Sequence, residues 1–236
     1  MRPLGQSFLQ AGWSVYGMLL PGFGAQIDTL FERHYSEWVA AVEESLVRLQ
    51  QDHDTVLLVG YSLGAALAVQ AAAAQSSTGL ILLAPFWQLA PKWQQLISLL
   101  LKPFFRQVRP FKKADFADPK IRRGVSNLLS DLDLDDPDVQ QALRALSIPI
   151  RMFEQLHRVG QAAFDLAPQV SIPTLIVQGT QDEVARLNRT RRLLQRFPGP
   201  LNYVELAAGH DLIRSDQSAW PRLEHAVLDF ARQTVS

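Results

Sequence analysis

Short apolar runs alternate with longer stretches of helical period along most of the chain. Two of the runs, TVLLVG and LILLA, are apolar at nearly every position, as expected of strands buried on both faces of a sheet. The alternation predicts an α/β fold in which helices flank a mostly parallel central sheet. The predicted strands are 14–19, 55–59, 79–83, 174–177 and 202–206, and the predicted helices are 3–10, 32–51, 63–75, 184–197 and 217–233.

Residues 85–168 interrupt this alternation. The stretch looks helical and irregular and is rich in Pro, Phe and Trp. We therefore expect a core formed by 1–84 and 169–236, with 85–168 inserted as a helical cap. Within the cap, Asp136 followed by Pro137 predicts the N-cap and first residue of a helix.

One segment of the cap, PKWQQLISLLLKPFFRQ at 91–107, combines basic and apolar residues. Its basic residues either lie on a face exposed to solvent, or they form the polar side of an amphipathic helix that contacts a lipid surface or an acyl chain. Both interpretations stay open, so peripheral lipid contact through the cap is one expectation.

Composition narrows the class of protein. The 236 residues are 47% hydrophobic and 19% charged, which favours one globular domain. Lys plus Arg and Asp plus Glu number 23 each, so a protein that neutralises many nucleic-acid phosphates is disfavoured. The absence of cysteine excludes disulfides, thiolate zinc sites and cysteine nucleophiles.

Membrane and metal signals are weak. No run approaches the about 18 apolar residues that span a bilayer, and the N-terminal residues do not resemble a signal peptide, so we expect a cytoplasmic protein.

Asp131, Asp133 and Asp135 match alternate positions of a calcium loop. However, Asp136 stands where that loop needs glycine and Ala142 where it needs a carboxylate, so no metal is expected.

The strongest chemical signal is GYSLG at residues 60–64, which matches G-x-S-x-G. It lies directly between an apolar strand and an Ala-rich helix, where a sharp turn exposes the serine hydroxyl. Bulky side chains in place of the glycines would clash with the strand and the helix. Ser62 is therefore the candidate nucleophile, and the free N–H of Leu63 at the helix start is a candidate oxyanion donor.

A serine nucleophile needs a base and a carboxylate that orients it. Asp182 follows the predicted strand 174–177, and His210 follows the strand 202–206. Because the carboxyl ends of parallel strands meet at one sheet edge, these side chains are expected to converge with Ser62. Glu183 and Asp211 are the rival carboxylates. The other histidines, His34, His53, His157 and His225, are expected to be structural or on the surface.

These motifs resemble the α/β-hydrolase superfamily, and most of all its small bacterial carboxylesterases and monoacylglycerol-lipase-like members. The resemblance implies that Ser62 is the nucleophile, His210 the base and Asp182 its orienting partner, and that the cap shapes an acyl pocket. The matching pieces are LLPGFG (19–24), HYSEWVAAVEESLVRL (34–49), VGYSLGAALA (59–68), LLAP (82–85), PTLIVQGTQDEV (173–184) and AGHDLIRSD (208–216).

The residues expected to bind substrate are aromatic. They are Phe23, Tyr61, Phe86 and Trp87, with Trp93, Phe104 and Phe105 as further aromatic residues of the cap. Ordinary packing of the cap on the sheet is the alternative explanation for the cap residues.

The chain departs from the family at its beginning. Relatives carry a further strand ending in His-Gly, whose loop supplies a second oxyanion donor, between the strands that here are 14–19 and 55–59. Here that strand and loop are absent, so unpaired strand edges and a weakened oxyanion site are expected. Three explanations stay open: a truncated or wrongly assigned start, a short form whose sheet closes up, and pairing with another chain.

The predicted function is hydrolysis of carboxylic esters with short to medium acyl chains, through an acyl-enzyme and without a cofactor. Serine at the nucleophile position disfavours dehalogenases and epoxide hydrolases, which use aspartate. One alternative is a thioesterase or a monoacylglycerol or lysophospholipid hydrolase. Another is a non-catalytic relative that binds an acyl ligand or a partner. The sequence leaves the oligomeric state open.

Overall fold

The computed structural model describes residues 1–75, 77–88, 106–128 and 132–235. The chain forms two compact units, one from Met1–Leu89 and Gln155–Ser236 and the other from Ala90–Glu154. The second unit is shorter than the expected cap, 85–168. The last part of that range, from Gln155 on, belongs to the first unit. In the described part of the chain, no helix is both long and apolar enough to span a bilayer.

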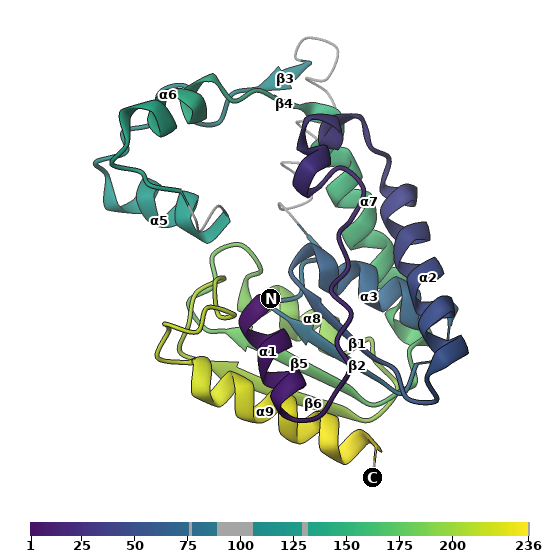
Figure 1. Ribbon diagram of the computed structural model, residues 1–236. Helices are drawn as coiled ribbons and strands as arrows, with labels where there is room; N and C mark the ends of the chain where they lie inside the picture. The colour runs from purple at the N-terminus through teal and green to yellow at the C-terminus, as the bar shows by residue number, and fades with distance from the viewer. Residues whose placement is uncertain (76, 89–105, 129–131, 236) are drawn as a thin grey trace. The chain divides into compact units, whose positions relative to one another are not determined.

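The larger unit is built on a four-stranded parallel sheet (Figure 1). Its strands are β1 (Leu57–Tyr61), β2 (Gly79–Leu83), β5 (Thr174–Gly179) and β6 (Leu201–Leu206), in the spatial order β1-β2-β5-β6. Every residue of β2 is buried, as the run LILLA predicts, and so is every residue of β5. The same prediction for TVLLVG is wrong in part, because four of the five residues of β1 are only partly buried. The predicted parallel sheet flanked by helices is therefore confirmed.

Helices cover both faces of this sheet. On one face α3 (Leu63–Ala74) packs on β1 and β2, and α2 (Tyr35–Asp52) packs on α3. On the other face α9 (Trp220–Val235) packs on β2, β5 and β6 and also contacts α1 (Arg2–Gln10). The helix α8 (Leu187–Leu194) packs on β5. Ile81 and Leu83 of β2 join Leu223 and Val227 of α9 in one apolar core cluster.

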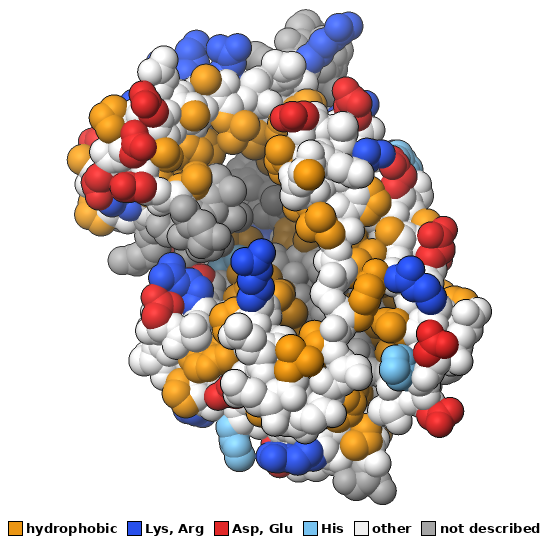
Figure 2. All heavy atoms as spheres, in the orientation of Figure 1, with side chains coloured by type: hydrophobic (Ala, Val, Ile, Leu, Met, Phe, Trp, Pro, Cys, Tyr) orange, Lys and Arg blue, Asp and Glu red, His pale blue; other side chains and the backbone are white. Residues whose placement is uncertain are grey.

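The predicted strand at 14–19 is wrong. These residues form an irregular segment, so among the described residues β1 pairs only with β2 and its other edge carries no strand. Without a ladder partner an extended segment has no reason to stay in a sheet. Three of its large side chains are exposed, Val15 (43%), Tyr16 (51%) and Leu19 (67%), and hydrophobic side chains gather at the surface along this segment in Figure 2.

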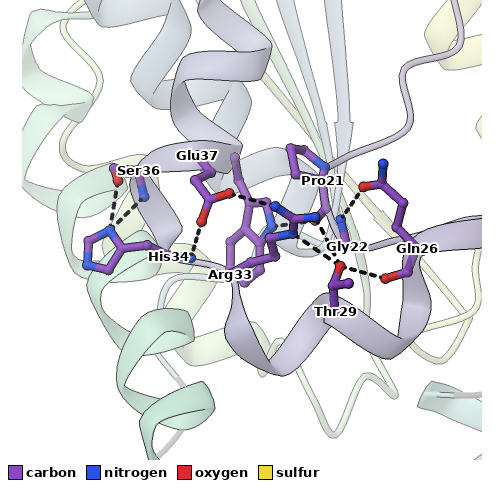
Figure 3. A network of polar contacts seen from close by, with 9 residues as sticks. Pro21, Gly22, Gln26, Thr29, Arg33, His34, Ser36 and Glu37 are labelled. Atoms are coloured by element: carbon purple, nitrogen blue, oxygen red, sulfur yellow. Dashed lines mark hydrogen bonds and ion pairs between the residues drawn. The ribbon is translucent and has the colours of Figure 1, made fainter.

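The segment after residue 20 is fixed by polar contacts at the start of α2 (Figure 3). A 3₁₀ helix, η1 (Gly24–Glu32), precedes α2, and the Gln26 side chain accepts the N–H of Gly22 at 3.3 Å. His34 caps α2, because its ring accepts the Ser36 N–H while Glu37 accepts the His34 N–H. His34 is thus structural, as expected.

The smaller unit has its own core. It contains α5 (Pro119–Leu128), α6 (Pro137–Ala145) and a short antiparallel pair, β3 (Gln107–Val108) with β4 (Ile148–Pro149). Asp136 caps α6 and Pro137 is its first residue, which confirms that prediction. The apolar core consists of Phe116, Val125, Leu134 and Leu143. Residues 91–105 of the predicted amphipathic segment lie outside the described residues.

The return to the larger unit runs through α7 (Ile150–Leu166) and η2 (Ala167–Gln169). From Gln155 onward α7 belongs to the larger unit. There the buried side chain of Gln70 in α3 donates to the backbone oxygen of Val159 at 3.1 Å. This bond ties α7 to the helix that begins at Ser62.

Candidate active site

Ser62 lies in the turn between β1 and α3, with a backbone φ of 53° and ψ of −116°. Such a positive φ is strained for a non-glycine residue and persists only where the surroundings hold it. Here the Ser62 N–H donates to Leu83 at 2.9 Å, and the Ser62 carbonyl accepts from Ala65 at 3.0 Å. The end of β2 and the first turn of α3 thus hold the strained residue.

The two glycines beside Ser62 differ in how tightly they are packed. A Cβ on Gly60 would lie 2.5 Å from the Ala65 Cα and 2.5 Å from the Gly64 carbonyl oxygen. A Cβ on Gly64 would meet nothing within 4 Å. The expected clash is therefore confirmed for Gly60, whereas Gly64 has room for a Cβ and the prediction for bulky side chains there stays a prediction.

The Gly60→Ala variant is expected to be less stable by about 2 kcal/mol or more, because backbone atoms must move to admit the methyl group. The matched control is Gly64→Ala, which is expected to change stability by less than about 1 kcal/mol, since alanine also favours the helix. Urea unfolding followed by circular dichroism measures both. Equal stabilities for the two variants would contradict the packing argument.

Two further polar side chains meet Ser62 at the carboxyl edge of the sheet. His210 follows β6, and its Nε2 lies 2.9 Å from the Ser62 Oγ. Its Nδ1 lies 2.8 Å from the Oδ2 of Asp182, which follows β5. A carboxylate only accepts, so these partners assign the proton to Nδ1 and leave Nε2 free to take the serine proton. The structure thus brings the three predicted residues into one chain of hydrogen bonds.

The Asp182 carboxylate is buried, with 6% of its residue surface exposed, and four donors surround it. Its Oδ1 accepts the N–H groups of Val184 and Ala185, each at 2.8 Å. Its Oδ2 accepts from His210 and from the side chain of Gln178, the latter at 3.1 Å. Every lone pair is used, so the charge is stabilised and the direction of the carboxylate is fixed.

The rival carboxylates do not take this place. Asp211 accepts from the Gln217 side chain at 3.2 Å, and no hydrogen bond between described residues joins Glu183 to His210. His157 and His225 lie in α7 and α9, and His53 is the C-cap of α2.

Tyr61, expected to bind substrate, uses its hydroxyl within the protein. The hydroxyl donates to the backbone oxygen of His210 at 2.9 Å, and the two rings lie 5.3 Å apart. Burial raises the pKa of Tyr61, and the charges of Asp182 and Asp211 raise it further. The phenol therefore stays protonated and supports the loop that carries His210.

The two predicted cap residues that the structure describes, Phe86 and Trp87, are 6% and 8% exposed. Trp87 stacks on Phe164 of α7 at 4.2 Å between ring centroids, and its Nε1 donates to the Arg189 carbonyl at 2.9 Å. These contacts favour the packing alternative for Trp87. Trp93, Phe104 and Phe105 lie outside the described residues.

The last two predicted residues are Phe23, before η1, and Leu63, at the start of α3. Phe23 packs near Trp38, with ring centroids 6.4 Å apart, and its N–H donates to Leu20 at 3.0 Å. Leu63 is the first residue of α3, and no hydrogen bond between described residues uses its N–H. That amide therefore points out of the helix start as a free donor for an anion.

Sequence reasoning missed two residues of this site, Gln178 and Thr190. Gln178 lies at the end of β5 and Thr190 in α8, and both are fully buried. The available signal was the polar glutamine in the apolar run TLIVQG, since an amide in such a strand needs buried partners. Among the described residues, no group of three His, Asp or Glu side chains is arranged to hold a metal ion.

Comparisons with known proteins agree that the chain is similar to hydrolases. The model of a hydrolase family described as serine aminopeptidase, S33, matches residues 1–214. A thermostable monoacylglycerol lipase of Bacillus sp. (strain H-257) is 34% identical over 67 residues, which is 28% of this chain and 27% of the lipase. The chain thus matches about a quarter of that curated relative.

Solved structures are similar to most or nearly all of the chain. A structure from work on the metagenome-derived lipolytic enzymes LipS and LipT is similar with a TM-score of 0.75 and 20% identity, covering 98% of this chain and 87% of that one. The monoacylglycerol lipase of Paleococcus ferrophilus has a TM-score of 0.61 and 14% identity, covering 86% and 76%. At these identities the likeness shows the α/β-hydrolase fold.

Proposed function

Since the chain belongs to the serine aminopeptidase S33 family of α/β-hydrolases, we propose that it is a serine esterase that cleaves carboxylic esters of short to medium acyl chains. The observation that carries the proposal is the chain of hydrogen bonds from Asp182 through His210 to Ser62, at 2.8 and 2.9 Å. A hydroxyl that touches an oriented imidazole is the arrangement that makes serine nucleophilic.

The proposed reaction has two steps. His210 Nε2 takes the Ser62 proton while Oγ attacks the ester carbonyl, and the Leu63 N–H stabilises the oxyanion. The imidazolium then protonates the leaving alcohol, and an acyl-enzyme remains. Water loses a proton to the same nitrogen and attacks the acyl carbon, which releases the acid and returns the proton to Ser62. The residues named here need no metal or organic cofactor for these steps.

Monoacylglycerol hydrolysis is a second candidate, because the matched Bacillus relative is a monoacylglycerol lipase. It requires the same three residues and differs in the alcohol that leaves. A comparison of 1-monobutyrin with p-nitrophenyl butyrate, which share one acyl group, separates the two substrates. A higher kcat/KM on monobutyrin would favour the monoacylglycerol assignment.

We expect the protein to hydrolyse p-nitrophenyl esters and to be labelled by a fluorophosphonate probe at Ser62. In a series from two to twelve acyl carbons, kcat/KM is expected to peak at short to medium length, because a bounded apolar pocket binds a limited chain. An aminoacyl p-nitroanilide serves as the peptidase control suggested by the family description. A flat profile would contradict the acyl pocket, and folded protein that is neither active nor labelled would contradict the esterase.

A further inference from the structure

Gln178 occupies an unusual place for a glutamine. It is fully buried near the end of β5, a strand whose six residues are all buried. Burying an amide among apolar strands is costly unless each polar atom finds a partner. All the polar atoms of Gln178 do, and their partners come from three different parts of the larger unit.

The partners determine which way the amide faces. Nε2 lies among three oxygens: the Ala185 carbonyl at 2.8 Å, the Asp182 Oδ2 at 3.1 Å and the Gly179 carbonyl at 3.1 Å. Exchanging the amide oxygen and nitrogen would place an oxygen against three acceptors, so nitrogen must lie there. The amide therefore donates to the Asp182 carboxylate.

The opposite end of the amide is held as firmly. Its Oε1 accepts from the Thr190 hydroxyl at 2.7 Å, and Thr190 in α8 is fully buried. Gln178 thus links strand β5, the loop that carries Asp182 and helix α8. A buried network in which every member is satisfied is rigid and holds one arrangement.

We propose that Gln178, held by Thr190, is a positioning residue that fixes the Asp182 Oδ2 against His210. The backbone donors of Val184 and Ala185 bind only Oδ1. Donors on one oxygen alone would let the carboxylate turn about Oδ1. Among the described residues, the donors on Oδ2 are Gln178 and His210. The inference rests on the proposed function for its catalytic consequence, but the geometry that it concerns exists whether or not the protein cleaves esters.

The test replaces Gln178 by methionine, which has a similar length and volume but cannot donate. The matched control is Gln70→Met. Gln70 is also buried, at 5% exposed, and donates to the carbonyls of Ala66 and Val159 without touching the three site residues. Both variants lose a buried amide, so a purely structural effect should appear equally in both.

Two measurements are made on each folded variant. The first is the solvent exchange rate of the His210 Nδ1 proton, observed by NMR on protein labelled with ¹⁵N-histidine. The second is the separation of kcat from KM for p-nitrophenyl butyrate. In Gln178→Met we expect exchange at least about tenfold faster and kcat about tenfold lower, with KM within about twofold, because the lost bond is made to a charged group.

If the exchange rate of the His210 Nδ1 proton and the kcat were the same in Gln178→Met as in Gln70→Met, the proposal would be overturned. If Gln178→Met does not fold, Thr190→Val is the second variant. It keeps the volume and removes only the donor to Oε1, and it should change exchange and kcat in the same direction by about threefold. Unchanged values there would also overturn it. A wild-type protein without esterase activity would refute the proposed function, while the exchange rates would still decide the role of Gln178.

Discussion

Replacing Ser62 by alanine is expected to lower kcat/KM for p-nitrophenyl butyrate by at least about 10⁴-fold, because among the described residues Ser62 supplies the one hydroxyl hydrogen-bonded to the imidazole of His210. Fluorophosphonate labelling should disappear at the same time. The fold should persist, since alanine also occupies Ala84, the other non-glycine residue with positive φ among those described. Ester hydrolysis by stopped-flow absorbance and probe labelling by mass spectrometry measure the two effects.

Ser36 provides the matched control for this experiment. Its hydroxyl also lies against a histidine ring, 2.7 Å from the Nδ1 of His34, but that pair caps α2 (Figure 3). We expect Ser36→Ala to keep activity within about twofold, because a cap contributes to helix stability and not to the reaction. If Ser62→Ala retained more than a hundredth of the wild-type kcat/KM, the proposed nucleophile would be wrong.

The Asp182→Asn variant is expected to lose about 10⁴-fold in kcat, since it changes which nitrogen of His210 carries the proton. Two backbone N–H groups face Oδ1, so the amide oxygen of asparagine must lie there and its NH₂ must face His210. The ring then has to accept at Nδ1 and carry its proton on Nε2, where it cannot take the Ser62 proton. Steady-state kinetics measure the loss, and circular dichroism checks the fold.

Asp211→Asn is the control for that variant. Asp211 is the neighbour of His210 in sequence, yet its carboxylate accepts from Gln217. Activity within about twofold of the wild type is therefore expected. Comparable losses in the two variants would mean that general electrostatics, and not the orientation of His210, determine the rate.

The local pattern of the sequence predicted most of the fold and the place of the proposed chemistry. The runs TVLLVG and LILLA have the length and the apolar, branched composition of strands in a parallel sheet, and they form β1 and β2. GYSLG between such a strand and an Ala-rich helix predicts a sharp turn at the serine, and the structure gives Ser62 a φ of 53° in that turn. These predictions depend on neighbours in sequence, which is why they could be made without coordinates.

What the sequence had wrong or left open depends on contacts between distant segments. Residues 14–19 have the composition of a strand but lack a partner at the β1 edge, and a strand exists only through its ladder. For Trp87 the sequence left substrate binding and packing open, and its indole N–H bonds to the carbonyl of Arg189, about a hundred positions away. Periodicity carries no information about such partners.

The sequence by itself therefore determined the α/β class, the strand-to-helix turn at Ser62, and the candidates Asp182 and His210, because strand ends in a parallel sheet meet at one edge. Only the tertiary structure decided which carboxylate oxygen His210 contacts, that Tyr61 supports the His210 backbone, and that Gln178 and Thr190 complete the network. Hydrogen bonds depend on distance and direction to within a few tenths of an ångström, and that precision arises only when the packed elements bring remote side chains together.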